Sequence, residues 1–223
     1  MGKYEVGVLG NFDSKIGTVV GARWKGITYM RHKGRKSTKP PTASQLDKQA
    51  KFAMVAKFAN KFRKLLMAGY PDTTEQTQIN QAVSEIYRKA VTGIYPAYSL
   101  VYSKVSLSKG ELHNATLPTA VAAGGGIIKF TWTDNTDDNG AMADDKAILA
   151  VYCPELEQSL FKLGGAHRST GADILNVANF TGKLVETWVS FISADGKTAA
   201  TSIYTGQCRW FAGYFGRIKR TFT

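Results

Sequence analysis

The stretch LVETWVSFIS at residues 184–193 carries the strongest strand signal in this sequence. Apolar side chains run through it with few breaks, and the same holds for AILAVYC at residues 147–153. Such runs are typical of strands at the centre of a sheet. Residues 99–107 and 127–133 alternate instead between apolar and polar side chains, which indicates half-buried strands.

A turn that follows the first of these stretches supports the same fold. Asp195 and Gly196 form a hairpin signal between residues 184–193 and a further run at residues 198–205. Six or seven short strands over about a hundred residues are what an immunoglobulin-like β-sandwich needs. We therefore expect such a sandwich at residues 94–208.

A helix is expected upstream of the sandwich. Thr42 and Gln45 have the spacing of a capping box, which predicts that a helix begins there. Apolar residues then recur at intervals of three and four and form one face: Val55, Phe58, Phe62, Leu65 and Leu66. Gly69 predicts the end of the helix, with Pro71 just beyond it.

A second helix is expected directly afterwards. Asp72 and Glu75 have cap spacing, and Gly93 predicts the helix end. An apolar stripe lies between them: Ile79, Ala82, Val83, Ile86, Tyr87 and Ala90. Because the link between the two helices is short, residues 42–93 are predicted to form an antiparallel helical hairpin.

The first 41 residues are rich in glycine and in short β-forming runs. Six glycines fall within the first 26 residues: Gly2, Gly7, Gly10, Gly17, Gly21 and Gly26. Residues 16–20 and 27–30 favour short strands joined by tight turns. So few residues cannot bury a core, so this arm must pack on the rest of the chain or on another chain. The predicted fold class is α+β, with a Gly-rich β arm and basic linker at residues 1–41, a helical hairpin and a β-sandwich.

Positive charge is concentrated at the two ends of the chain. The formal net charge is +12, and residues 1–69 hold 15 Lys/Arg against 3 Asp/Glu. Residues 209–223 hold 4 Lys/Arg and no acidic residue, so residues 70–208 carry −4. This distribution attracts phosphate, anionic lipid or an acidic protein surface. It also suits self-assembly in which a basic arm contacts the acidic part of a neighbour.

A basic cluster ends the arm, within RHKGRKSTKPP at residues 31–41. We expect contact with nucleic acid, another anion or an acidic partner through five side chains: Arg31, Lys33, Arg35, Lys36 and Lys39. Trp24 and Tyr29 just upstream can stack on single-stranded bases or serve as assembly contacts. The other interpretations of this segment are a solvated connector and an arm between subunits.

Residues 209–223 form a basic aromatic tail. Chain ends are usually polar and frayed, but this one holds a dense aromatic cluster. Aromatic side chains beside arginine are typical of interface hot spots. We expect four of them to cover the sandwich or to contact a neighbouring subunit: Trp210, Phe211, Tyr214 and Phe215.

Two loops match ligand-binding motifs in part. DNTDDNGAMADD at residues 134–145 follows part of a calcium loop, but Lys146 stands where the last ligand belongs. GGAHRSTG at residues 164–171 has glycines beside Arg168, but the Gly-Lys-Ser/Thr of a phosphate-binding loop is missing. We therefore predict a turn and a strand connection. No metal site, cofactor or catalytic residue is expected, and no activity as an enzyme.

The two cysteines and the chain start suggest a reducing compartment. Cys153 and Cys208 are too few for a disulfide framework and lack the spacing of a zinc site, so free thiols are expected. The start lacks the basic flank and apolar run of a signal peptide. No stretch is long and apolar enough to span a membrane. We expect the protein in the cytoplasm or in a phage-like particle.

Short motifs spread along the chain suggest a family. They are GTVVG at residues 17–21, WKG at 24–26, Arg31, PTASQLDKQAKF at 41–52, AVTGIYP at 90–96, TWTD at 131–134, DKA at 145–147 and FISADG at 191–196. In this combination the chain resembles, over nearly its full length, a Bacteroidetes family that carries only a domain-of-unknown-function label. That resemblance implies no established activity.

The first third is also similar to the start of phage-encoded, virion-type proteins. In both, a Gly-rich strand pair leads through an arginine to a helix that begins Pro-Thr-x-x-Gln. This similarity implies a structural part of a phage particle or of a phage-derived assembly.

These features predict a non-enzymatic structural or assembly protein that forms homo-oligomers. Its partners would be copies of itself or other particle proteins. The alternative is a sequence-nonspecific nucleic-acid-binding protein that uses the basic cluster. A third interpretation is a ligand-binding β-sandwich, which needs a concave site with converging polar groups.

Overall fold

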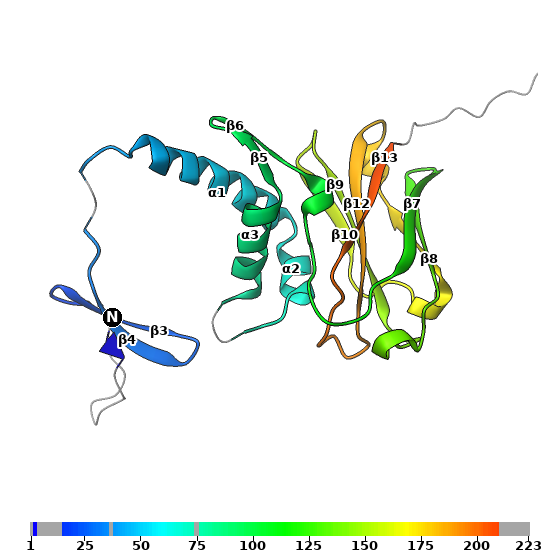
Figure 1. Ribbon diagram of the computed structural model, residues 1–223, viewed down its shortest axis with the longest axis horizontal. Coiled ribbons are helices and arrows are strands. Elements are labelled where there is room, and N and C mark those ends of the chain that lie inside the picture. Colours follow the sequence, from blue (N-terminus) through cyan, green and yellow to red (C-terminus); the bar gives the residue numbers. More distant parts are fainter. Residues whose placement is uncertain (1, 4–14, 36–37, 74–75, 210–223) are drawn as a thin grey trace, which may run out of the picture. The chain divides into compact units, whose positions relative to one another are not determined.

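The computed structural model describes residues 2–3, 15–35, 38–73 and 76–209 of the 223-residue chain (Figure 1). The chain forms two compact units, Met1–Gln45 and Leu46–Thr223, and the second is called the body below. Every pairing between named strands is antiparallel. The described chain has three α-helices and a larger number of strands, so the expected α+β class is confirmed.

The described part of the first unit is a small antiparallel sheet. It has the order β1-β4-β3-β2, where β1 is Gly2–Lys3, β2 is Lys15–Ile16, β3 is Val19–Trp24 and β4 is Ile27–His32. A two-residue turn joins β3 to β4 at Lys25 and Gly26, which have φ angles of 47° and 81°. A hairpin this tight needs positive φ at both positions, which glycine adopts without strain.

Helix α1, Ala43–Lys61, begins at the capping box expected from the sequence. The Thr42 backbone N–H donates to Gln45 Oε1 at 2.9 Å, and the Gln45 N–H donates to Thr42 Oγ1 at 3.3 Å. This reciprocal pair satisfies N–H groups that have no partner within the helix.

The helix expected to continue to Gly69 is divided at Phe62. Its φ and ψ angles there are −104° and 16°, and helix α2 runs separately from Arg63 to Gly69. Phe62 is fully buried, with its ring centroid 6.2 Å from that of Trp188 and 6.1 Å from that of Tyr152. Residues from both helical segments therefore join one core around this ring.

Helix α3, Gln78–Lys89, begins later than expected. Its cap is Thr77, whose Oγ1 accepts a hydrogen bond from the Asn80 N–H at 3.3 Å. The prediction of a cap at Asp72 is therefore wrong, and Glu75 lies outside the described residues. The segment between α2 and α3 is longer than a short link for this reason.

Gly93 does not end a helix but lies in a hairpin that directly follows α3. The hairpin consists of β5, Val91–Ile94, and β6, Ala97–Leu100. Gly93 has a φ of 100°, and a Cβ at this position would lie 2.3 Å from the Ala97 carbonyl oxygen. The strand expected at residues 99–107 is therefore mostly wrong, since β6 ends at Leu100 and a 3₁₀ turn follows at Tyr102–Lys104.

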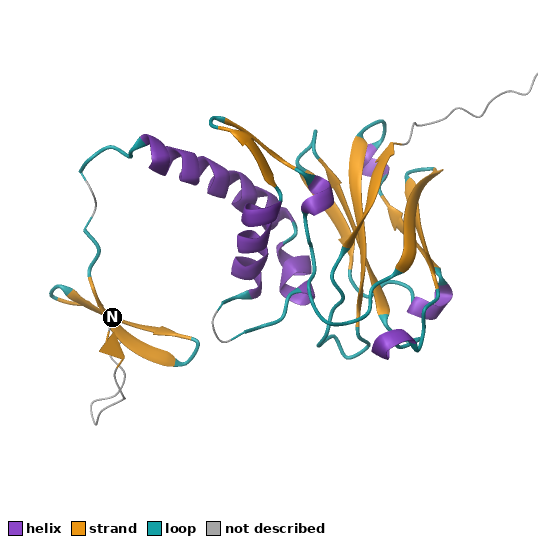
Figure 2. Ribbon diagram, in the orientation of Figure 1, coloured by secondary structure: helices purple, strands orange, loops and turns teal. Residues whose placement is uncertain are grey.

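Seven strands of the body form two sheets that share one core (Figure 2). One sheet has the order β11-β8-β7 and the other the order β10-β9-β12-β13. Their bounds are β7 Thr116–Gly124, β8 Ile127–Thr133, β9 Lys146–Cys153, β10 Gln158–Lys162, β11 Ala172–Asn176, β12 Leu184–Ile192 and β13 Ile203–Arg209. Seven antiparallel strands divided between two sheets in this way form a β-sandwich.

The strands predicted from residues 127–133, 147–153 and 184–193 are confirmed as β8, β9 and β12. The hairpin signal at Asp195 and Gly196 is confirmed as a turn, in which the Gly196 N–H donates to the Ser193 carbonyl at 2.9 Å. The strand after it starts later than expected, at Ile203.

β9 is apolar almost throughout and β12 is mostly apolar, because both faces of each strand are buried. One face of β9 packs into the core between the sheets through Ala147, Leu149, Val151 and Cys153. The opposite face packs against the helices through Ile148, Ala150 and Tyr152. The body thus has three layers, and Figure 1 shows the helices outside the four-stranded sheet.

Residues 116–126, within an uncharged stretch of the sequence, form β7 and its turn into β8. Gly124, Gly125 and Gly126 all have positive φ angles, of 81°, 59° and 78°. Within the part of the chain that the structure describes, no helix has the length and apolar character needed to cross a membrane.

Candidate interaction surface

The arm sheet places aromatic and basic side chains on one face. Trp24 lies opposite Ile27 in the register of β3 and β4, and Tyr29 and Arg31 follow Ile27 at alternate positions along β4. Because successive side chains of a strand point to opposite faces, Trp24, Tyr29 and Arg31 share one face. Arg31 of the basic cluster thus shares one surface with Trp24 and Tyr29, the aromatic pair just upstream of that cluster.

This hairpin leaves large apolar side chains exposed to solvent. The exposed fractions are 37% for Val19, 41% for Trp24, 42% for Ile27 and 40% for Met30. Among the arm residues whose burial the structure describes, only Gly21 and Thr28 are buried. The described sheet therefore buries very little of its own apolar surface.

The basic cluster continues from this face. Arg31, Lys33, Arg35 and Lys39 are exposed, whereas Lys36 lies outside the described residues. The Lys33 N–H donates to the Thr18 carbonyl at 2.8 Å, which ties the start of the linker to the sheet. Lys25 adds a further cation, with its Nζ 5.7 Å from the centre of the Trp24 ring. Aromatic and cationic groups are therefore adjacent on the arm.

The four aromatic residues selected in the tail are Trp210, Phe211, Tyr214 and Phe215. All four lie outside the described residues. The expected assembly contact of the tail therefore stays a prediction.

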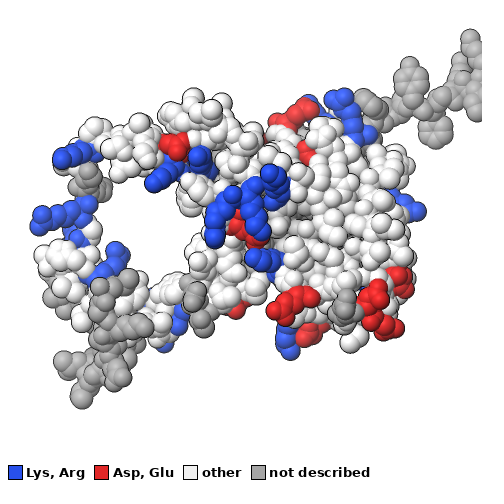
Figure 3. Space-filling model, in the orientation of Figure 1, with Lys and Arg blue, Asp and Glu red and all other residues white. Residues whose placement is uncertain are grey.

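Exposed acidic side chains gather at one end of the sandwich, where the loop between β8 and β9 lies (Figure 3). This loop is the predicted turn at residues 134–145, and it exposes Asp134, Asp137, Asp138 and Asp144. Hydrogen bonds from the Thr136 hydroxyl and N–H hold the pKa of Asp134 below its ordinary value. The loop is therefore a local patch of negative charge at neutral pH.

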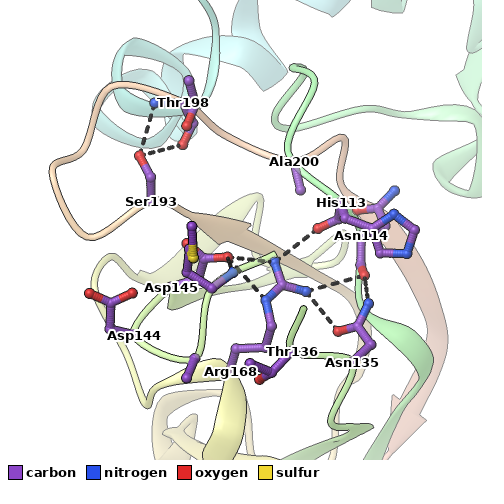
Figure 4. Close-up of polar contacts among 12 residues, drawn as sticks. His113, Asn114, Asn135, Thr136, Asp144, Asp145, Arg168, Ser193, Thr198 and Ala200 are labelled. Atoms are coloured by element: carbon purple, nitrogen blue, oxygen red, sulfur yellow. Dashed lines mark hydrogen bonds and ion pairs between the residues drawn. The ribbon is translucent and has the colours of Figure 1, made fainter. Parts of the chain in front are cut away.

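The same loop also contributes to a buried network around Arg168 (Figure 4). The Arg168 side chain is 0% exposed and that of Asp145 is 2% exposed. Nε of Arg168 donates to Asp145 Oδ2 at 3.1 Å, and Nη2 forms an ion pair with the same oxygen at 3.0 Å. Nη1 donates to Asn135 Oδ1 at 2.8 Å, and Nη2 to the His113 carbonyl at 2.9 Å. Charge-assisted bonds of this kind are strong and directional.

Two further contacts complete this Arg168 network. The guanidinium carbon lies 4.0 Å from the centre of the Phe191 ring, which is a cation–π geometry. The Trp132 indole N–H donates to the Arg168 carbonyl at 2.7 Å. The network therefore connects the loop before β7, the loop between β8 and β9, and the segment between β10 and β11.

The Arg168 network uses the key side chains of the two loops that match ligand-binding motifs in part, residues 134–145 and 164–171. Arg168 is the cation of the possible anion loop at residues 164–171, and it is used within the core. Asp145 belongs to the partial calcium loop, and its Oδ2 accepts from Arg168 and from the Met142 N–H at 3.0 Å. In the described ranges, no group of three His, Cys, Asp or Glu side chains could hold a metal ion.

Two concavities of the body were not expected from the sequence. A groove of about 530 Å³ between α1 and α3 is lined by Phe52, Val83 and Tyr87 together with polar side chains. A pocket of about 310 Å³ is lined by Tyr102 and Tyr152 with other aromatic residues. These rings come from segments far apart in the sequence, so no local spacing could have indicated the pocket.

Comparison with known proteins finds one matching family. A family model described as a family of unknown function (DUF6266) matches residues 10–206. Among curated proteins, none matches the chain. The fn3 domain of the human collagen alpha-1(XX) chain is a similar solved structure, with 10% sequence identity and a TM-score of 0.33. That similarity covers 46% of this chain and 89% of the collagen domain.

Proposed function

The chain belongs to a family of unknown function (DUF6266), and from its own residues we propose that it is a non-enzymatic structural or assembly protein that forms homo-oligomers. The arm is the contact between subunits in this proposal. One observation carries it, namely the apolar side chains that the arm sheet leaves in solvent. Exposed apolar surface of this kind is typical of interaction sites.

The charge distribution supports the same proposal. The exposed basic residues from Arg31 to Lys39 suit an acidic surface on a neighbouring subunit. The exposed aspartates at residues 134–144 form such a surface, and every copy of this chain carries it. Opposite charges on two parts of one chain favour contact between copies. The similarity of the first third to virion-type proteins of phages supports a place in a phage-like particle.

The mass in solution tests the arm contact. We expect the double variant Trp24→Ser with Ile27→Ser to weaken subunit association. In the proposed interface these two apolar side chains are buried against a neighbouring subunit, and the variant removes them. A loss of about 2–3 kcal/mol corresponds to a rise of roughly 30- to 150-fold in Kd. Light scattering on a sizing column, over a dilution series, measures this change.

Ile94→Ser is the matched control, because Ile94 is 84% exposed in the body hairpin. We expect this variant to assemble like the wild type. A wild-type chain that is monomeric at every concentration would contradict the proposal, as would equal assembly of the Trp24 and Ile27 variant.

A second candidate function is sequence-nonspecific binding of single-stranded nucleic acid. The specific observation is that Trp24, Tyr29 and Arg31 share one face, since stacking rings beside a cation suit bases and phosphates. This candidate predicts binding that falls steeply with salt. Replacing the five basic residues of the cluster with glutamine should flatten that slope, as measured by fluorescence anisotropy. Absence of binding at low salt would exclude this candidate.

A further inference from the structure

The pocket of about 310 Å³ in the body has the size of a small-molecule site. Pockets of this type typically enclose about 300–1,000 Å³ and combine apolar walls with a few polar groups. Its lining comes from the second half of α1, from β6 and the turn after it, from the end of β9, and from the connection between β9 and β10. We call it the aromatic pocket.

Three rings form one wall of the aromatic pocket. The Phe58 and Tyr152 centroids are 5.0 Å apart in an edge-to-face arrangement. Tyr102 lies 5.8 Å from Tyr152 and 6.3 Å from Phe58. Rings packed in this way hold one another in place, so the wall is rigid before any ligand arrives.

The hydroxyl groups on this wall lack protein partners. Tyr152 is only 7% exposed, yet neither its hydroxyl nor that of Tyr102 forms a hydrogen bond with any described residue. Neither hydroxyl oxygen is among the described polar atoms that are fully buried without a partner, so both are open to a ligand in the pocket. Burial raises the pKa of Tyr152 to about 12, so the hydroxyl keeps its proton at neutral pH. It can therefore both donate to a ligand and accept from one.

Charged groups at the pocket set the sign of a suitable ligand. Lys57 pairs with Glu157 at 2.6 Å, so these two charges compensate each other. Lys61 also lines the pocket and forms no ion pair with any described residue. The pocket therefore carries one uncompensated positive charge. A quaternary ammonium ligand, which aromatic cages often bind, would be repelled by this net positive charge.

We propose that the aromatic pocket binds a monosaccharide unit, with a preference for a sugar that carries a carboxylate. A pyranose ring has an apolar C–H face that stacks on a phenol ring. Its hydroxyl groups both donate and accept, as do those of Tyr102 and Tyr152. The carboxylate would contact Lys61. This site is independent of the arm and goes beyond the assembly function proposed above.

Titration of the full chain with two matched sugars tests the proposal. The probes are methyl β-glucuronide and methyl β-glucoside, which differ in the carboxylate, with tetramethylammonium as the cation probe. Trp188 reports binding through its fluorescence, since its ring lies 6.4 Å from that of Tyr102. We expect both sugars to saturate the signal, each with a Kd of about 1 mM or below. The Kd of the glucuronide should be about fivefold lower than that of the glucoside. Tetramethylammonium should not saturate the signal.

Matched variants assign the binding to the pocket. Tyr152→Phe keeps the ring and removes the hydroxyl, so it should weaken both sugars by about tenfold. Tyr87→Phe, in the groove between α1 and α3, should leave both unchanged. Lys61→Gln should remove the preference for the glucuronide, whereas Lys64→Gln, an exposed lysine of α2, should preserve it.

Two results would overturn the proposal. One is a wild-type protein that shows no saturable signal with either sugar up to roughly 20 mM, well above a millimolar Kd. The other is binding that Tyr152→Phe and Lys61→Gln leave unchanged. Thermal melting of each variant shows that its body is folded, so a loss of binding is assigned to the site.

Discussion

Replacing Arg168 with methionine removes the guanidinium from the Arg168 network and leaves an unbranched side chain in its place. The Asp145 carboxylate, 2% exposed, then stays buried without its partner. Breaking a buried ion pair in this way costs about 3–5 kcal/mol, because one charge is left uncompensated. Asn135 and His113 also lose their donors, at 2.8 and 2.9 Å. We therefore expect the free energy of unfolding to fall by about 4 kcal/mol.

Urea unfolding followed by tryptophan fluorescence measures this loss. Trp132 is a suitable reporter because its indole N–H donates to the Arg168 carbonyl at 2.7 Å. For a body of this size, a loss of about 4 kcal/mol corresponds to a fall of about 8–16 °C in Tm. Asp145→Leu alone should also destabilise strongly. The double variant should cost less than the sum of the two, because it buries no unpaired charge.

An exposed ion pair provides the control. Lys183 pairs with Glu155 at 2.6 Å, but the two side chains are 41% and 48% exposed. Solvent weakens such a pair, so Lys183→Met should leave the urea midpoint of unfolding nearly unchanged. If Arg168→Met matched the wild type in both midpoint and slope, the assignment of a buried, stabilising pair would be refuted.

Two further predictions concern the body. Gly93→Ala should lower the free energy of unfolding by about 2 kcal/mol or more, since a Cβ would meet the Ala97 carbonyl oxygen at 2.3 Å. Gly124→Ala is the control, because its Cβ would lie in open space, and it should lower the free energy of unfolding by about 1 kcal/mol. Equal urea midpoints for the two variants would contradict this. Burial opposes ionisation of Asp173, but the Lys162 ammonium and two backbone N–H groups lower its pKa overall. Its carboxylate therefore stabilises the fold above the unfolded pKa of about 3.9, and this stability is lost as the pH falls through the lower folded pKa. Asp173→Asn should be less stable than the wild type at pH 7, and a gap that stays constant down to about pH 2 in urea titrations would argue against this effect.

The central strands could be predicted from the sequence because their signal is local. In β9 and β12 both faces are buried, so after Lys146 every side chain of β9 is apolar, and in β12 six of nine are. β7, Thr116–Gly124, was missed for the opposite reason. It consists largely of Ala and Thr with one Pro and is half exposed, so its alternation carries little contrast in hydrophobicity.

Helix caps were predicted where one candidate stood alone and missed where several competed. Thr42 is confirmed, since it and Gln45 form the reciprocal bonds of a capping box. Before α3, both Asp72 and Thr77 are suitable cap residues. Gln81 Nε2 donates to the Pro71 carbonyl at 3.0 Å, which holds the preceding segment as a loop against the helix. That contact spans ten residues and is absent from the local pattern.

The Arg168 network and the aromatic pocket could not be predicted from spacing. Arg168 and Asp145 are 23 residues apart, and each lies in a loop that matches a ligand motif in part. Only the fold places one beside the other. The rings of Phe58, Tyr102 and Tyr152 likewise meet through three separate segments, and each one alone indicates nothing more than a core residue.

The helical layer over the four-stranded sheet limits how this fold can be divided. A truncated chain that begins at residue 94 would uncover Trp188, Ile148 and Tyr152, which the helices bury. The sandwich is therefore not a transplantable module, although seven strands suggest one. Gene fusions and exchanges between family members must move the helices and strands as one block.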